Sequence, residues 1–511
     1  MKKIILVLII LIICIGVGGF IFLKSLVPKQ EEYIAYEKEK QITQVDAQLK
    51  GIDAEKVRAK KDIIMEKSIE EIQGSIAKGE LTYEELTAFY LDRIKTYDAG
   101  ERGINAVATI NPNAIKEAKL HDTKPVKKGS MWGIPILIKD NINTKNMTTS
   151  GGTYALKDFV PENNAEMVDE LIGSGAVILG KSNLSELANH MDNKMPSGYS
   201  SKAGQTHNPF NPIKLSPLGS SSGSGAAVAA NFSAVAIGTE TTGSIIAPSA
   251  IHSIVGFKPT KDAVSTEGVI PLSSTMDTVG PMAKNVKDIV ALYNAAIWDK
   301  SKSISQELDA EYLRGKKVGI RGDDEGGFLA KKLKACGAEV VKVELSEEGI
   351  DNDYIITQDF KTGLNNYLKT YNAPVKSLSE LIDFNKNDLS RRAKYGQTLI
   401  EEANQVKDFN KAKVNKMVEE ARKRIDSVLR DNGLEVIVFL DNKGVLLSSV
   451  AGYPELTVPT GALEGGAPTG ATFIASQNED SKLANAAYSF EQNNMARLIP
   501  EKYIKYEREN K

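Results

Sequence analysis

One stretch of sequence organises this chain: LSPLGSSSGSGAAVAANFSAVAIGTETTGSIIAP, residues 215–248. It holds two loops of small residues, 219–225 and 238–244, on either side of the apolar run 226–237. Glycine, serine and threonine in a loop allow several backbone N–H groups to point at one ligand, and the serines can serve as nucleophile or proton carrier. One such loop is typical of a surface turn, whereas two around a buried segment favour a reactive site.

The sequence GSSSGSGAAVA, followed by GTETTGSIIAP, resembles the glycine- and serine-rich core of the amidase signature family, serine hydrolases that cleave linear amides. The resemblance implies a catalytic triad of a lysine, a serine behind a cis peptide bond and a nucleophilic serine. It places the nucleophile at Ser244 and the cis serine at Ser220, with the cis bond between Gly219 and Ser220. The lysine belongs to GIPILIKDNINT, at Lys139. All three positions carry the residue that the family requires.

The order of the predicted elements favours an α/β fold class. A buried strand over 133–139 ends at the lysine, and 175–188 repeats a strand–loop–helix pattern. Small residues predict a closely packed helix over 226–236. The resemblance implies the amidase signature fold, a large twisted mixed β-sheet covered by helices on both faces. It spans 68–505, which we treat as one amidase domain, followed by a C-terminal tail at 506–511.

The composition is that of an ordinary globular protein. The chain has 511 residues, of which 41% are hydrophobic and 25% charged, and its net charge is −2, which gives no indication of a nucleic-acid partner. Its two cysteines, Cys14 and Cys336, are not expected to form a disulfide. No group of Cys, His and Asp residues has the spacing of metal ligands, so neither a metal nor a cofactor is expected.

The N-terminus carries an apolar run, IILVLIILIICIGVGGFIFL, at residues 4–23. As a helix this run would be about 30 Å long, the thickness of the hydrocarbon core of a bilayer. No small-residue cleavage site follows it. Residues 1–23 are therefore predicted to be a membrane anchor with a transmembrane helix over 4–23, and Lys2 and Lys3 favour a single-pass membrane protein whose catalytic domain lies outside the cytoplasm.

Residues 24–67 are rich in lysine and glutamate and are predicted to form a charged helical stalk between the membrane and the catalytic body. The stalk carries apolar residues at a 3-4-3 spacing, a fragment of a heptad seam: Ile42, Val45, Leu49 and Ile52. The globular part is expected to begin at Ser68. Capping boxes, Ser68 with Glu71 and Thr82 with Glu85, predict two helix starts there.

Two other motifs compete with the triad. Residues 175–182 match the phosphate-binding pattern G-x-x-x-x-G-K-[ST], but the middle residues are apolar and strand-forming, so their N–H groups are expected to belong to a sheet. Residues 219–223 match G-x-S-x-G, the nucleophile elbow of α/β-hydrolases. Three prolines precede that match, His252 is the only histidine after it, and Glu240 is the only carboxylate between the match and His252. The scarcity of histidine favours lysine as the base.

An amidase must activate a nucleophile, stabilise an oxyanion and protonate the leaving nitrogen. The resemblance implies that Ser244 attacks the carbonyl carbon and that Ser220 relays its proton to Lys139. Lys139 must then be neutral, and burial next to 136–138 favours a lowered pKa. Asp140 would oppose this effect and is expected to point elsewhere. The predicted oxyanion hole consists of the backbone N–H groups of Thr241, Thr242, Gly243 and Ser244.

Two positions depart from the family pattern, with Thr242 in place of glycine and Ile246 in place of arginine. A branch resembling peptide amidases has similar changes and a segment like DFKTGLNNYL, residues 359–368. The expected substrates are therefore small-molecule or peptide amides, in particular C-terminal peptide amides or apolar acyl amides.

Two alternatives stay open. An amidotransferase subunit that makes amidated transfer RNA would use glutamine and bind a partner subunit. A catalytically inactive surface protein that binds through the same fold would not react with a fluorophosphonate.

Overall fold

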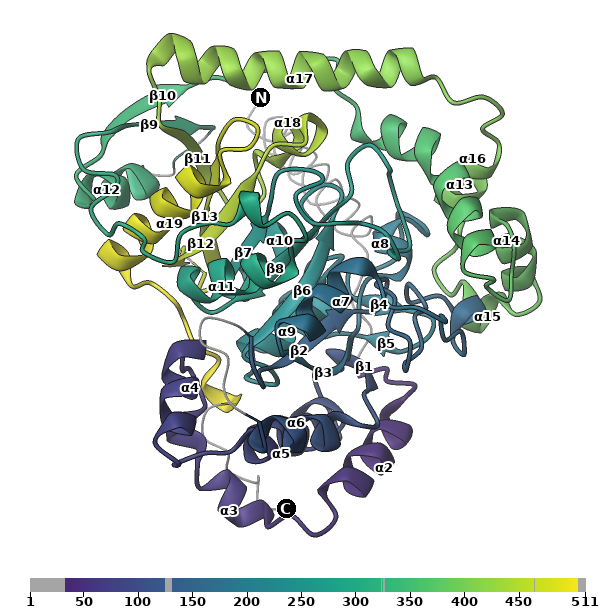
Figure 1. Ribbon diagram of the computed structural model, residues 1–511. Helices are drawn as coiled ribbons and strands as arrows, with labels where there is room; N and C mark the ends of the chain where they lie inside the picture. Colours follow the sequence, from purple (N-terminus) through teal and green to yellow (C-terminus); the bar gives the residue numbers. More distant parts are fainter. Residues whose placement is uncertain (1–32, 125–130, 323, 325–326, 464, 504–511) are drawn as a thin grey trace, which may run out of the picture.

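The computed structural model describes residues 33–124, 131–322, 324, 327–463 and 465–503. At its centre lies one mixed β-sheet of eleven strands, in the order β1-β3-β2-β6-β8-β7-β12-β13-β11-β9-β10 (Figure 1). A separate two-stranded sheet pairs β4 (Tyr199–Ser200) with β5 (Gly204–Gln205). The strands of the large sheet are β1 (Val107–Ile110), β2 (Pro135–Lys139), β3 (Val177–Ser182), β6 (Val235–Glu240), β7 (Val255–Lys258), β8 (Thr278–Ala283), β9 (Lys317–Arg321), β10 (Glu339–Val343), β11 (Val436–Leu440), β12 (Glu455–Ala462) and β13 (Pro468–Ile474).

The pairing of β2 decides where the site forms. β2 lies parallel to both β3 and β6, so its carboxyl end, which carries Lys139, lies beside the carboxyl ends of these two strands. Every residue of the three strands is buried, as expected of parallel strands covered on both faces. Antiparallel pairs join β6 to β8 and β12 to β13. The large mixed sheet predicted from the family resemblance is therefore confirmed.

Helices surround this sheet, and they fall into three groups (Figure 1). One group packs at the N-terminal side, a second accompanies the strands, and a third forms a cap, defined here as α13–α16, beside the carboxyl ends of β2 and β6. The helices are α2 (Lys38–Leu49), α3 (Ala54–Arg58), α4 (Ile69–Ala77), α5 (Tyr83–Arg93), α6 (Ala114–Asp122), α7 (Glu166–Gly173), α8 (Glu186–Asn189), α9 (Ser222–Ala229), α10 (Ile246–Ile251), α11 (Val286–Ala296), α12 (Phe328–Ala335), α13 (Asn352–Thr370), α14 (Leu378–Lys386), α15 (Leu389–Arg392), α16 (Thr398–Asn404), α17 (Lys411–Asn432), α18 (Val445–Ala451) and α19 (Asp480–Asn494).

Local sequence signals account for several helix boundaries. Both predicted capping boxes are present at the starts of α4 and α5. The helix predicted over 226–236 is shorter than expected, because α9 ends at Ala229 and the chain then turns into β6. Asn231 makes this turn with φ +57°, a left-handed conformation that asparagine tolerates. The β-branched Val235 and Ile237 that follow favour a strand.

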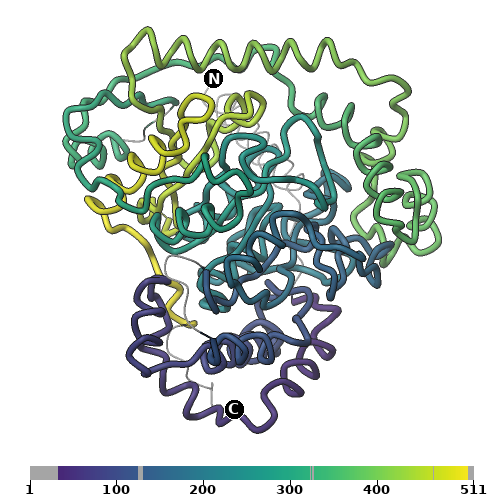
Figure 2. Tube along the Cα trace, in the orientation of Figure 1, coloured from purple at the N-terminus to yellow at the C-terminus, as the bar shows by residue number. Residues whose placement is uncertain are grey.

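The described part of the predicted stalk is packed on the catalytic body. In α2, Val45 is fully buried in the main core, and Gln41 Nε2 donates to the carbonyl of Val107 in β1 at 2.6 Å. The apolar side of this helix therefore packs on the catalytic body, and the helix lies along that body. The last described residues, 495–503, return to the same side, where the yellow segment passes the purple N-terminal helices (Figure 2).

The predicted fold class needs one correction. No helix in the part of the chain that the structure describes is long and apolar enough to cross a membrane. The two longest described helices, α17 with 22 residues and α13 with 19, carry charged residues along their length. Residues 4–23, on which the transmembrane prediction falls, lie outside the described residues. The prediction took the apolar run as a helix from its length and hydropathy alone, so the transmembrane helix and the single-pass localisation are withdrawn.

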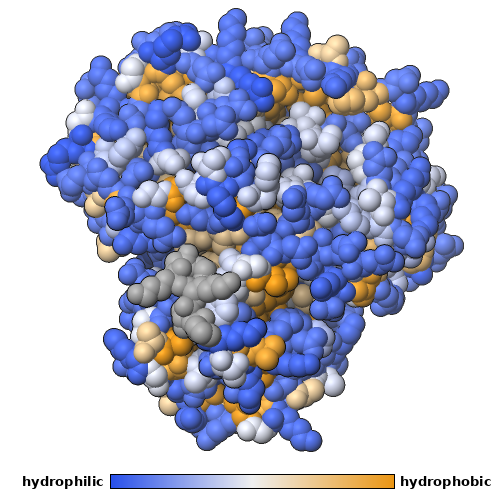
Figure 3. Space-filling view, in the orientation of Figure 1, coloured by the Kyte–Doolittle hydropathy of each residue, from blue (hydrophilic) through white to orange (hydrophobic). Residues whose placement is uncertain are grey.

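The surface follows the composition. Charged and polar side chains cover most of the face in Figure 3, and apolar residues form small separate groups on it. This distribution is ordinary for a globular protein, since apolar atoms always contribute part of a protein surface.

Candidate active site

Lys139 is the last residue of β2 and has no exposed surface. Its Nζ lies 2.8 Å from Ser220 Oγ and 2.8 Å from Thr239 Oγ1, and it donates to the carbonyl of Thr239 at 3.0 Å. Burial lowers the pKa of Lys139 to about 7, although the carboxyl groups of Asp277 and Glu240 oppose this effect. The amine is therefore neutral in a large share of molecules near pH 7, as a base must be.

Asp140 points away from this amine, as expected. Its carboxylate accepts hydrogen bonds from the Ser150 hydroxyl and from Lys202 Nζ, the latter at 3.0 Å, and lies 3.6 Å from Lys181 Nζ. Two buried lysines, Lys181 and Lys202, thus lie next to the Asp140 carboxylate.

Ser220 lies in the first glycine- and serine-rich loop, which comes before α9. The peptide bond between Gly219 and Ser220 is cis, at the position that the resemblance implied. A side chain at Gly219 is excluded, because a Cβ there would lie 2.3 Å from Ser185 Oγ. Ser220 is fully buried, with its hydroxyl directed at Lys139.

Ser244 lies in the second loop, between β6 and α10. The preceding Gly243 has φ +74°, a conformation that glycine adopts without strain. The Ser244 carbonyl accepts a hydrogen bond from the N–H of Ser221 at 3.1 Å, so the two loops lie in direct contact. Ser244 is 7% exposed, and its hydroxyl has no hydrogen-bond partner among the described residues. It is accordingly available to a ligand.

The hydroxyl of Ser221, in contrast to that of Ser244, is hydrogen-bonded to the backbone at the end of β6. Its hydroxyl donates to the carbonyl of Thr239 at 3.1 Å and accepts from the N–H of the same residue at 3.2 Å. Both contacts tie the first loop to the end of β6. The hydroxyl is therefore occupied by structural contacts, unlike that of Ser244.

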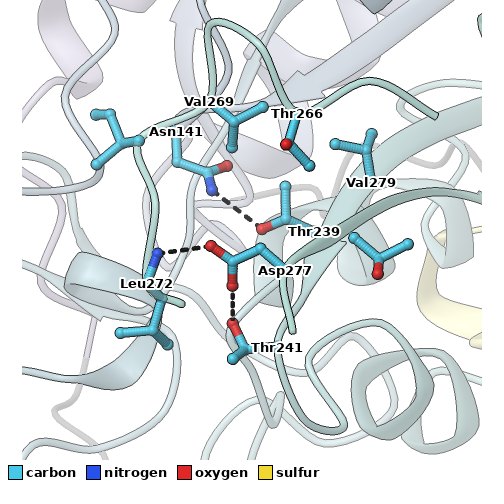
Figure 4. Close-up of a pocket in the computed structure, with 10 residues that line it drawn as sticks. Asn141, Thr239, Thr241, Thr266, Val269, Leu272, Asp277 and Val279 are labelled. Carbon is cyan, nitrogen blue, oxygen red and sulfur yellow. Dashed lines mark hydrogen bonds between the residues drawn. The ribbon is translucent and has the colours of Figure 1, made fainter. Parts of the chain in front are cut away.

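A small cavity opens beside the lysine, lined by the carboxyl end of β6, the start of β8 and the loop before β8 (Figure 4). Asp277 lies at its wall and accepts hydrogen bonds from Thr241 Oγ1 at 2.6 Å and from the N–H groups of Leu272 and Ser273. Burial raises the pKa of Asp277 to about 6. Asn141 Nδ2 donates to Thr239 Oγ1 at 3.0 Å, so the cavity reaches the immediate partners of Lys139.

Comparison with known proteins agrees with this geometry. The family model described as Amidase matches residues 85–439. This chain belongs to the amidase signature family. It is therefore an enzyme of the amidase class, whose members hydrolyse amides.

Two solved amidase structures and one curated relative resemble this amidase over most of its length. An amidase family protein from Bacillus anthracis str. Ames is 42% identical and superposes with a TM-score of 0.90 over 93% of this chain and 100% of its own. The peptide amidase from Stenotrophomonas maltophilia is 36% identical, with a TM-score of 0.80 over 85% of this chain and 98% of its own. A glutamyl-tRNA(Gln) amidotransferase subunit of Thermoanaerobacter pseudethanolicus is 31% identical over 85% of this chain and 98% of its own.

The four N–H groups predicted for the oxyanion hole of the amidase do not have the same surroundings. The Gly243 N–H donates to Glu240 Oε1 at 2.8 Å and is therefore engaged within the protein. The N–H groups of Thr241, Thr242 and Ser244 have no acceptor among the described residues. The Thr242 hydroxyl also has none.

The cap reaches the active site through one face of α13, which contains the segment 359–368. Asp359 accepts hydrogen bonds from the Ser273 hydroxyl at 2.6 Å and from the Thr275 N–H at 2.9 Å. Gly363 lies against Pro271, and the Tyr367 hydroxyl donates to Asn143. These three positions are four residues apart and so share one side of the helix. The segment that resembles peptide amidases thus holds the loop that carries Asp277.

Apolar side chains complete the surroundings of the nucleophile loop. Ile246, fully buried at the start of α10, belongs to the same apolar cluster as Leu272 and as Phe360 of the cap. No group of three or more His, Cys, Asp or Glu residues within the described ranges has the arrangement of a metal site.

Sequence reasoning missed the residues that support the three predicted ones. Thr239 and Glu240 lie inside the stretch 215–248 and were detectable as polar residues ending a buried strand. The contacts of Asp277 with Thr241 and of Asp359 with Ser273 and Thr275 had no local signal, because only the fold brings these residues together.

Proposed function

We propose that this amidase hydrolyses linear amides through Ser244, Ser220 and Lys139 by way of an acyl-enzyme. The observation that carries the proposal is the 2.8 Å contact between Lys139 Nζ and Ser220 Oγ in a fully buried setting. A buried, neutral amine is a proton acceptor, and the hydroxyl next to it can pass a proton in either direction.

In the first half-reaction, Ser244 Oγ attacks the carbonyl carbon of the substrate. Its proton passes to Ser220 Oγ while the Ser220 proton passes to Lys139 Nζ. The negative charge on the former carbonyl oxygen is stabilised by the unengaged N–H groups of Thr241, Thr242 and Ser244, since fixed donors in a water-poor site stabilise such a charge strongly.

The proton held by Lys139 is then passed on to the leaving group. Lys139 and Ser220 deliver a proton to the leaving nitrogen, the C–N bond breaks, and the acyl group stays on Ser244. Water then attacks the ester carbonyl and gives a proton to the same pair of residues. As the bond between the acyl carbon and Ser244 Oγ breaks, Ser220 and Lys139 return that proton to Ser244 Oγ, and the carboxylic acid is released. Lys139 ends neutral, as it began.

For the substrate we propose C-terminal peptide amides or apolar acyl amides. The peptide amidase from Stenotrophomonas maltophilia is 36% identical, and Val269, Ile270 and Leu272 give the cavity beside Thr239 an apolar lining. An apolar acyl group is favoured there because its burial removes hydrocarbon surface from water.

The test is labelling of the full chain with a fluorophosphonate. The parent and Ser221→Ala should form an adduct, and mass spectrometry should place it on Ser244. Ser244→Ala should form none, and Lys139→Ala should react at least about 100-fold more slowly, as expected on loss of a general base. An adduct that survives Ser244→Ala would refute the assignment. A parent that forms none would favour the inactive binding protein.

The amidotransferase alternative rests on the relative at 31% identity. It would be supported by co-purification with a partner subunit together with glutamine-dependent amide transfer. Hydrolysis of an N-acyl dipeptide amide by the isolated chain, measured as ammonia release, would favour the amidase instead.

A further inference from the structure

The turn that carries Ser244 is held by a single buried carboxylate. Glu240, the last residue of β6, is 1% exposed. Its Oε1 accepts from the Gly243 N–H at 2.8 Å, and its Oε2 accepts from the N–H groups of Ile245 and Ile246 at 2.6 and 2.9 Å. These donors lie on both sides of Ser244 in the chain. Glu240 therefore determines the backbone path through the nucleophile.

A second buried carboxyl group lies directly behind the first. Glu455, the first residue of β12, has no exposed surface, and its carboxyl group and that of Glu240 act on each other electrostatically. Its Oε1 accepts from the Ser449 hydroxyl at 3.0 Å and lies 3.6 Å from Lys258 Nζ. Its Oε2 has no donor among the described residues. A buried carboxylate oxygen without a donor is costly, whereas the same oxygen bearing a proton can itself donate.

The charges around this pair indicate how many protons it holds. The ammonium group of Lys258 is in contact with Glu455. The residue at position 246 is an isoleucine, which carries no charge that could pair with Glu240. The carboxyl group of Asp480 in α19 interacts electrostatically with Lys258, and that of Glu240 interacts electrostatically with Lys139. With both carboxyl groups ionised, two adjacent buried anions would face the one Lys258 ammonium. With one proton shared, one anion faces one cation, and the repulsion between the carboxylates is removed.

We propose that Glu240 and Glu455 share one proton and are positioning residues for the nucleophile turn, an inference that rests on the proposed function of Ser244. Protonated Glu455 donates to the Glu240 carboxylate, and that carboxylate holds the three N–H groups. The Ser244 hydroxyl and the unengaged N–H groups then keep the direction that the reaction needs. Neither residue touches the substrate.

The titration of Glu455 supports this arrangement. Burial raises the pKa of Glu455 well above its usual value, Lys258 opposes this effect, and Glu240 adds to it. A rise in pH through this raised pKa removes the shared proton, so two carboxylates then repel each other under the turn. Activity should consequently fall on the alkaline side, separately from the rise caused by deprotonation of Lys139 at lower pH.

The experiment compares Glu455→Gln, Glu455→Leu and Ser449→Ala with the parent in the full chain. The readouts are the fluorophosphonate labelling rate and the kcat and KM for an N-acyl dipeptide amide, each across a pH series, with melting curves to confirm folding. Glutamine keeps a donor towards Glu240 at every pH, so Glu455→Gln should retain kcat within about threefold and lose the alkaline fall. Leucine offers no donor, so Glu455→Leu should lose about 10- to 100-fold in kcat at unchanged KM, somewhat less than removal of an oxyanion donor. Ser449→Ala should keep the alkaline fall.

The outcomes separate this proposal from the proposed function. An alkaline fall that persists unchanged in Glu455→Gln would overturn the shared proton, even if Glu455→Leu fails to fold. A folded Glu455→Leu with parental kcat would overturn the positioning role. A parent that is not labelled on Ser244 would instead refute the catalytic assignment on which both depend.

Discussion

At the scale of single residues, burial lowers the pKa of Lys139 and so makes it a candidate base. The strand that ends at Lys139 is buried along its whole length, and the amine faces hydroxyl and carbonyl oxygens rather than a carboxylate. The sequence predicted the burial from the apolar run and required that Asp140 face elsewhere. Only the structure supplied the reason for that orientation, the contacts of the Asp140 carboxylate with the Ser150 hydroxyl and with two buried lysines.

The lowered pKa of Lys139 predicts the pH dependence of both activity and stability. Because this pKa is about 7 in the folded protein, kcat/KM should rise with pH and level off above about 7. The pKa is near 10.5 for a free lysine, so the folded chain binds fewer protons than the unfolded chain between these values. Stability should therefore be lowest below pH 7 and rise as the pH increases towards 10.5.

The variant Lys139→Met tests the predicted rise of stability with pH. The variant removes the titrating group at similar volume, so its melting temperature should exceed that of the parent more at about pH 6 than at about pH 9, while activity is lost at both. Lys145→Met, at an exposed lysine just after the same strand, is the matched control and should leave the pH dependence unchanged. A parental pH dependence in Lys139→Met would contradict the assignment of the titration to this amine.

At the scale of elements, one helix of the cap supports the active site from outside it. α13 contacts the loop before β8 through Asp359 and Gly363, and that loop contacts the second glycine- and serine-rich loop, 238–244, through Asp277 and Thr241. The segment 359–368 resembles peptide amidases in sequence, but its role could not be predicted from that likeness. A helix pattern specifies which residues share a face and leaves open what the face meets.

Asp359→Ala should weaken both the cap and the turn. The change leaves the Ser273 hydroxyl and the Thr275 N–H without their acceptor, so the free energy of unfolding should fall by about 1–3 kcal/mol. kcat/KM should fall as well, because the loop that carries Asp277 loosens. Denaturant unfolding and steady-state kinetics measure the two effects. Asn366→Ala, on the exposed side of the same helix, is the control, and an equal loss in both variants would argue against a specific role for Asp359.

At the scale of the whole molecule, the two ends of the described chain are held against each other. Arg497 forms a bidentate pair with Glu66, with both N–O distances at 3.0 Å, and also donates to the carbonyl of Ser253. Burial opposes the charge of Glu66, but Lys284 and Arg497 outweigh it, so the pKa of Glu66 is lowered. The segment before α4, the turn before β7 and the segment after α19 are thereby joined.

Arg497→Ala should destabilise the protein and leave its chemistry intact. Loss of the paired hydrogen bonds should lower the free energy of unfolding by about 1.5–3 kcal/mol at neutral pH, with kcat unchanged. Because the pKa of Glu66 is lowered, this stabilisation is present above 4.5 and is lost as the pH falls through the folded-state pKa, so the difference from the parent should shrink in acid. Arg314→Ala, at an exposed ion pair, should change stability by less than about 0.5 kcal/mol. A large fall in kcat for Arg497→Ala would contradict a purely structural role.

The sequence by itself determined the α/β class, the family, the helix starts at Ser68 and Thr82, and the identities of the three residues proposed for catalysis. These features depend on local patterns, since hydrophobic periodicity, capping and glycine-rich loops act within a few residues of one another.

Only the tertiary structure decided the partners of those residues: Glu455 behind Glu240, Asp277 beside Thr241, the cap on its loop, and the packing of α2 on the body. Each contact joins segments far apart in the chain, and the order of strands in the sheet brings them together. That order is set by the packing of the whole core, which no short stretch of sequence contains.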